Sequence, residues 1–85
     1  MKWIIAILTR LAAIVLRAVV SKLLRNNDDL MALRPIAQAY AIKAALQAEF
    51  DLPKGASLVV YIRNGFPILF LRGVYGELHL IRIFV

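Results

Sequence analysis

The feature that most constrains this chain is its first segment, a long and mostly apolar stretch from Met1 to Leu24. The run is rich in Ala, Leu and Ile and holds neither Gly nor Pro, so we expect one helix over about residues 1–25. At a rise of about 1.5 Å per residue, such a helix is long enough to cross a hydrocarbon core of about 30 Å. Whether it does so depends on the charges that it carries.

Two arginines, Arg10 and Arg17, stand in the middle of this helix. Each costs about 2.5 to 3.5 kcal/mol at the centre of a membrane span, and the Ile, Leu and Val residues return about 4 to 7 kcal/mol together, so insertion gains nearly nothing. A helix lying in the membrane interface avoids this cost, because its basic residues meet headgroups. A cleaved signal peptide fits poorly, since Arg10 interrupts the apolar run and no small-residue cleavage site follows.

The basic residues of this helix define the surface expected to meet an acidic membrane. On a helical wheel most of them gather into one narrow stripe that includes Ser21, with the indole of Trp3 nearby. The residues expected to contact anionic headgroups are Lys2, Trp3, Arg10, Arg17, Lys22 and Arg25. The alternative is the core helix of a soluble, cytoplasmic oligomer, with the arginines along its wet edge.

The second helical segment, Asp28–Phe50, is rich in alanine and contains Pro35. A proline inside a helix removes one hydrogen bond and clashes with the preceding turn, so we expect a short turn before a helix that begins at Pro35. Asn27 is the expected cap of that turn. Four alanines at helical spacing predict the close approach of another helix: Ala37, Ala41, Ala44 and Ala48.

The third segment is rich in β-branched and aromatic residues. Asn64-Gly65 predicts a tight hairpin between the strands Ser57–Arg63 and Phe66–Arg72, because both central residues of a type I′ turn need positive φ. A further turn leads into a third strand over Glu77–Val85. The predicted fold class is α+β: one domain, residues 1–85, with two N-terminal helices packed on a C-terminal three-stranded antiparallel meander.

Pairing Arg63 with Phe66 and Arg72 with Glu77 fixes which side chains share a face of this sheet. The face expected to lie under the helices carries Leu58, Val60, Ile62, Leu69, Leu71, Leu78 and Leu80. The second face is also apolar and is expected in an oligomer or lipid interface, because a sheet with one wet side alternates polar and apolar residues. The residues expected to form the self-association surface are Tyr61, Phe66, Phe70, Ile81 and Ile83.

Two features of the predicted sheet bear on its edges. Pro67 conflicts with a fully paired middle strand, because it has no N–H to donate. The third strand ends at Val85 and lacks the charges that discourage pairing between edges, so its edge is a further candidate for self-assembly.

The composition also indicates that part of the apolar surface must contact a partner. Hydrophobic residues make up 62% of its 85 residues, more than a domain of this size can bury, so a second subunit or lipid must cover the surplus. The net charge of +6 favours acidic partners such as anionic lipid or nucleic acid. The absence of cysteine excludes a disulfide scaffold and a zinc–thiolate site.

Catalytic constellations are hard to assemble from these residues. The one histidine, His79, has only Glu77 as a local orienting carboxylate and is better explained as a packed strand residue. The hydroxyl residues stand in no nucleophile elbow, and the glycines match no phosphate-loop pattern. We therefore expect no enzymatic activity, no cofactor, no metal and no small-molecule substrate.

The sheet also supports an alternative function. Tyr61, Phe66 and Phe70 could stack on bases while Arg63 and Arg72 contact phosphates, as in proteins that bind single-stranded nucleic acid. Aliphatic residues dilute this face and the basic residues are dispersed along the chain, so nucleic acid is expected less than lipid or a second copy.

From Pro35 to Val85 the chain also resembles the ParE/RelE group of bacterial toxins, as a small, basic, cysteine-free protein with helices before an antiparallel meander. The resemblance implies a basic sheet face that engages ribosome or gyrase. It rests on architecture alone and carries over no site residues. That family begins with a strand and has more polar helices than Met1–Leu24.

The sequence as a whole favours a small, basic, non-enzymatic protein that associates with a membrane through its first helix and assembles with copies of itself. A soluble homo-oligomer that binds nucleic acid, or acts like these toxins, is the alternative.

Overall fold

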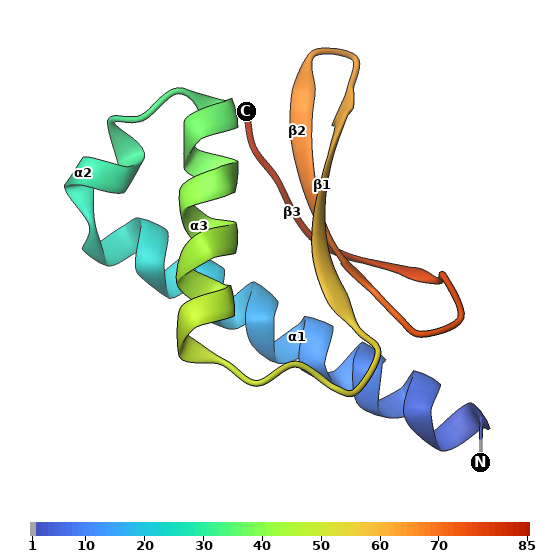
Figure 1. The fold of residues 1–85 in the computed structure, drawn as a ribbon. Helices are drawn as coiled ribbons and strands as arrows, with labels where there is room; N and C mark the ends of the chain where they lie inside the picture. Colours follow the sequence, from blue (N-terminus) through green and yellow to red (C-terminus); the bar gives the residue numbers. More distant parts are fainter. Residues whose placement is uncertain (1) are drawn as a thin grey trace.

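The computed structural model describes residues 2–85, with side chains from Ile4 onward. The elements in chain order are α1 (Lys2–Asn26), α2 (Asp28–Met31), α3 (Pro35–Glu49), β1 (Ser57–Arg63), β2 (Phe66–Arg72) and β3 (Leu78–Ile83). The strands form one antiparallel sheet in the order β1-β2-β3. Helix α1 runs past the sheet and α3, with its first turns at one end of the molecule (Figure 1). The predicted α+β class, helices followed by a three-stranded meander, is confirmed.

The break between the helices follows the expected pattern. The side chain of Asn27 caps α2 by accepting a hydrogen bond from the N–H of Leu30 at 3.2 Å, and Pro35 stands in the first turn of α3. Gln38 then ties the two helices together, because its side-chain amide donates to the carbonyl of Leu30 at 2.9 Å. The prediction of a short turn followed by a helix from Pro35 is confirmed.

The β1–β2 hairpin has the predicted turn and register. Asn64 and Gly65 both have positive φ, 52° and 83°, and Arg63 pairs with Phe66. Pro67 fits this strand for a geometrical reason. Its nitrogen points away from β1, because the neighbouring pair of Arg63 and Phe66 exchanges the hydrogen bonds of that ladder. On the β3 side Pro67 lies where pairing ends, and its carbonyl accepts the N–H of Phe84 at 2.9 Å.

The register of β3 differs from the prediction because the turn before it is longer by one residue. Arg72 pairs with Leu78, and Glu77 belongs to the loop. There the Glu77 carboxylate accepts the N–H of Tyr75 at 3.1 Å and its carbonyl accepts the N–H of Gly73 at 2.8 Å. A Cβ at position 73 would overlap that carboxylate, so any residue other than glycine there would displace the Glu77 side chain from this arrangement.

The prediction for Ile81 as a self-association residue is therefore wrong. A shift of one residue in a strand exchanges its two faces, so Leu78 and Leu80 lie on the uncovered face and Ile81, 6% exposed, lies in the core. A bulge opposite Leu69 and Phe70 then shifts the register again. After it, Ile83 returns to the uncovered face as predicted and Phe84 enters the core.

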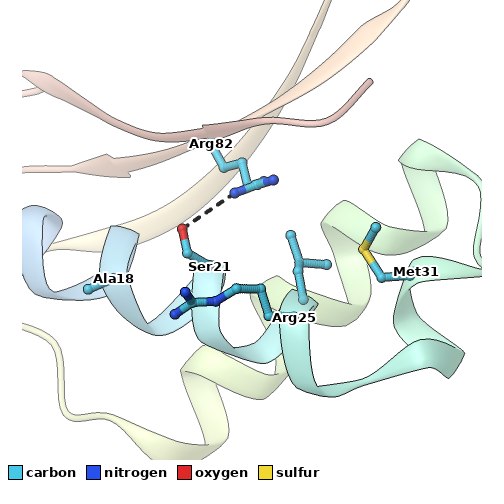
Figure 2. Close-up of a pocket in the computed structure, with 6 residues that line it drawn as sticks. Ala18, Ser21, Arg25, Met31 and Arg82 are labelled. Atoms are coloured by element: carbon cyan, nitrogen blue, oxygen red, sulfur yellow. Dashed lines mark hydrogen bonds between the residues drawn. The ribbon is translucent and has the colours of Figure 1, made fainter.

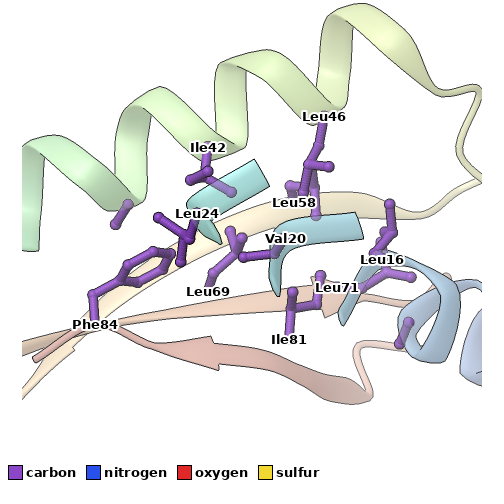
Figure 3. Close-up of a cluster of buried hydrophobic side chains, with 12 residues drawn as sticks. Leu16, Val20, Leu24, Ile42, Leu46, Leu58, Leu69, Leu71, Ile81 and Phe84 are labelled. Carbon is purple, nitrogen blue, oxygen red and sulfur yellow. The ribbon is translucent and has the colours of Figure 1, made fainter. Parts of the chain in front are cut away.

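The core lies between the helices and one face of the sheet (Figure 3). It joins side chains of α1, α3, all three strands and the C-terminal residues: Ala13, Leu16, Val20, Leu24, Ala39, Ile42, Leu46, Leu58, Leu69, Leu71, Ile81 and Phe84. Helix α1 packs mainly on β3, and α3 packs on β2 and β1. Both helices thus cover the same face of the sheet, and its other face stays uncovered.

The alanine stripe of α3 does not receive a helix. Ala37, Ala44 and Ala48 are exposed, and α3 is anchored instead by Ile42 and Leu46 on its other side. The side of α3 with the larger residues packs on the sheet because each of these side chains buries more apolar area than an alanine can.

The β3 register leads to a stability prediction. We expect Ile81→Ala to lower the free energy of unfolding by about 2–5 kcal/mol, because it leaves a cavity in the core, and Leu80→Ala by roughly 0.5 kcal/mol. Equilibrium chemical denaturation followed by circular dichroism measures both. A larger loss for Leu80→Ala than for Ile81→Ala would contradict the observed register.

Candidate functional site

One side of α1 is apolar and uncovered. The buried residues of the helix follow one stripe, which includes Ala13, Leu16 and Val20. On the opposite side, large apolar residues 36–57% exposed form what we call the outer face of α1: Ile4, Ile7, Leu8, Leu11, Ile14 and Val15. A soluble helix normally carries polar residues there, so this face is an exposed apolar patch of the kind that marks a contact with protein or lipid.

The basic residues of α1 flank this face or follow it. Arg10, Arg17, Lys22 and Arg25 are all exposed. Lys2 begins α1 and Trp3 follows it, but their side chains lie outside the described residues. Arg17 differs from the other basic residues because its Nε donates a hydrogen bond to the carbonyl of Leu80 in β3. Part of its bonding capacity therefore serves the fold.

A basic pocket lies where the last turns of α1 face β3 (Figure 2). Its volume is about 440 Å³, and its lining residues are Ala18, Ser21, Leu24, Arg25, Met31 and Arg82. The Nη1 atom of Arg82 donates a long hydrogen bond, 3.5 Å, to the hydroxyl of Ser21. The lining includes no carboxylate, and neither Arg25 nor Arg82 has an ion-pair partner among residues 2–85.

Two guanidinium groups and a hydroxyl form a donor set that suits a phosphate oxygen. Sequence reasoning placed Ser21 and Arg25 in one stripe but missed Arg82, which faces α1 from β3. The excess of basic over acidic residues was the only signal that pointed to Arg82, and it did not single out that residue.

A second, apolar groove lies beside the first turns of α1. Its volume is about 540 Å³, and it is lined by Ile5, Leu8, Pro53, Lys54, Gly55, Val74 and Tyr75. Leu8 belongs both to this groove and to the outer face of α1, so the apolar surface continues from the helix onto the neighbouring loops.

The uncovered face of the sheet forms the other apolar surface, which we call the outer sheet face. Tyr61, Phe66 and Ile83 are exposed on it, as expected. Phe70 is half-buried against Tyr61, with ring centroids 5.8 Å apart and planes tilted by 57°. Leu78 and Leu80 join this surface in the place of Ile81. Four of the five predicted self-association residues thus lie on one uncovered face.

The start of β3 brings a histidine close to a carboxylate. His79 Nε2 lies 3.9 Å from Glu77 Oε1, and both side chains are largely buried. The hydroxyl of Thr9 is also occupied, since it donates to the carbonyl of Ile5 at 2.9 Å. Among residues 2–85 no three His, Asp or Glu side chains gather as metal ligands would.

No protein-family model, curated protein or solved structure matches this chain.

The basic pocket leads to a binding prediction. We expect inorganic phosphate to shift the amide resonance of Ser21, and Arg82→Gln to weaken this binding about fivefold to tenfold, because a charged donor at a partly exposed site contributes roughly 1–1.5 kcal/mol. Arg63→Gln, at the tip of the hairpin, is the matched control and should leave the affinity unchanged. An equal effect of both substitutions would assign the binding to net charge rather than to the pocket.

Proposed function

We propose that this protein binds the surface of anionic membranes through the outer face of α1 and assembles with copies of itself, without enzymatic activity. The observation that carries the proposal is the position of that face. It is apolar, it lies opposite the core side of α1, and exposed basic residues such as Arg10 and Lys22 accompany it. This combination suits an interfacial helix, whose apolar side enters the acyl boundary while cations meet headgroups.

The fold favours lying on the membrane over crossing it. The stretch Ile4–Asn26 of α1 is long and apolar enough to span, a property shared with core helices and signal sequences. Crossing alone, however, would pull Leu16, Val20 and Leu24 off the sheet, and each core side chain that they leave exposed to water would cost about 1.5–3 kcal/mol. It would also bury Arg10 and Arg17, which nearly cancel the gain from insertion. Interfacial binding keeps the core intact and leaves both arginines at the surface.

The basic pocket adds an electrostatic contribution at the end of α1. Arg25 and Arg82 lie beyond the apolar part of the helix and present donors that suit a phosphate of a lipid headgroup. A Lys or Arg near an anionic surface contributes about 1 kcal/mol, so the pocket and the other basic residues of α1 favour acidic over zwitterionic membranes.

Self-assembly in this proposal uses the outer sheet face. The sheet lies between that face and the helices, so a molecule resting on its α1 side presents Tyr61, Phe66 and Phe70 away from the membrane. An apolar surface in that position meets water unless a second copy covers it.

A nucleic-acid function is the second candidate, and the pairing of Tyr61 with Phe70 near the exposed side chains of Arg63 and Arg72 favours it. Five aliphatic side chains interrupt that aromatic surface, however: Val59, Ile68, Leu78, Leu80 and Ile83. These neither stack on bases nor pair with them, so lipid and a second copy remain the better match.

Vesicle flotation tests the membrane contact. We expect the protein to float with vesicles that contain phosphatidylserine, and Leu11→Gln to weaken binding about fivefold, because it removes roughly 1 kcal/mol of apolar burial from a half-exposed side chain. Leu78→Gln is the matched control on the outer sheet face and should not change flotation. The reverse ranking would identify the sheet as the lipid-binding surface, and recovery of the wild type only in the soluble fraction would exclude the membrane.

Light scattering tests the self-association surface. We expect Phe70→Glu to yield smaller particles than the wild type, because a carboxylate next to Tyr61 cannot be buried in an apolar contact without a large desolvation cost. Particles of unchanged size would reject this face.

A further inference from the structure

The two edges of the sheet differ in how they are protected. Helix α1 packs along β3, and the Nε of Arg17 occupies the carbonyl of Leu80. The sequence pointed to the β3 edge as a site of pairing, but α1 already lies against it. The other edge is β1, which stands at the opposite side of the sheet (Figure 1).

The backbone of β1 presents free groups at this edge. Because Arg63 and Phe66 flank a two-residue turn, they exchange hydrogen bonds, and so does every second pair from there. The N–H and C=O groups of Leu58, Val60 and Ile62 therefore point away from β2. Leu58 is covered by the rest of the chain, with 2% of its surface exposed, so the open groups are those of Val60 and Ile62. Among residues 2–85 no hydrogen bond reaches these groups. A strand edge of this kind, whose only charged residue is Arg63 at its end, is a ready template for another strand.

We propose that a second copy of this chain pairs with β1 in the antiparallel direction, with Val60 opposite Val60 of the second copy. This register joins the open backbone groups of Val60 in both copies and places Leu58 opposite Ile62. It also places Arg63 opposite Ser57, so no like charges face each other across the interface. The product is a continuous six-stranded sheet.

The inference rests on the self-assembly in the proposed function and adds a contact at the β1 edge to the one at the outer sheet face. Antiparallel pairing of identical edges has its two-fold axis perpendicular to the sheet, so the helices of both copies lie on the same side. Both outer faces of α1 then approach the same bilayer, and the second contact benefits from the first through effective concentration.

Cysteine cross-linking tests the register, because the native chain has no cysteine. Hydrogen-bonded antiparallel pairs have Cα atoms about 5.5 Å apart, within disulfide range, so Val60→Cys should give a covalent dimer under mild oxidation. Ser57→Cys is the matched control on the same strand, since the two copies of residue 57 would lie about 20 Å apart. A dimer from Ser57→Cys and none from Val60→Cys overturns the proposed pairing.

A backbone variant tests whether the edge itself carries the dimer. Ile62 is 56% exposed and its N–H points outward, so Ile62→Pro should leave the hairpin intact, which circular dichroism verifies. It removes one donor from each copy and should raise the dimer dissociation constant about tenfold or more. Ile62→Ala keeps the N–H and should change it about threefold or less.

Sedimentation of the full chain in mild detergent measures these constants independently of vesicle flotation. A wild type that is monomeric under both conditions overturns the inference together with the self-assembly part of the proposed function. A dimer that survives Ile62→Pro overturns the β1 contact alone. Loss of flotation with an intact dimer overturns the membrane contact and leaves the pairing supported.

Discussion

The contact between one side of α1 and the sheet is the constraint on which the rest of this structure depends. Leu16, Val20 and Leu24 join side chains of α3 and all three strands in one cluster, so the helix that is most suited to lipid also supplies much of the protein core. This double use explains why α1 is apolar nearly all round, because one side packs in the core and the opposite side is the one proposed to enter the membrane. It also fixes the orientation of the molecule, because only the side that faces away from the sheet is free to meet anything else.

Much of the fold could be predicted because its signals are local. Asn27 and Pro35 act on their own neighbours, and Asn64-Gly65 sets a two-residue turn whose geometry determines the register on both sides. The helix bounds and the first two strands follow from such signals. The positions of the residues proposed to meet a membrane could also be predicted from the sequence, because the places of Arg10 and Lys22 on α1 depend only on helical periodicity.

The parts that sequence did not predict depend on contacts made at a distance. The turn before β3 is longer by one residue because Glu77 bonds back to Gly73 and Tyr75, and no pattern in the chain announces this arrangement. That single residue moved Ile81 into the core and placed Leu78 and Leu80 on the uncovered face. The alanines of α3 likewise suggested a helix contact, but the side that packs is chosen by the larger residues. The two apolar surfaces themselves were predicted; the residues of β3 that belong to the outer sheet face were not.

The bulge in β3 and the extra residue of the preceding loop form a pair of compensating offsets. Each adds one residue to β3 relative to β2, and together they add two, which restores the alternation of inward and outward side chains by the time the strand reaches Ile83 and Phe84. A length change at only one of these places would exchange the environments of the last residues of the chain. A change at both would leave them where they are. Each insertion or deletion between Arg72 and the C-terminal residues shifts the alternation of inward and outward side chains by one residue. The C-terminal residues therefore keep their environment only when a second change of this kind compensates for the first.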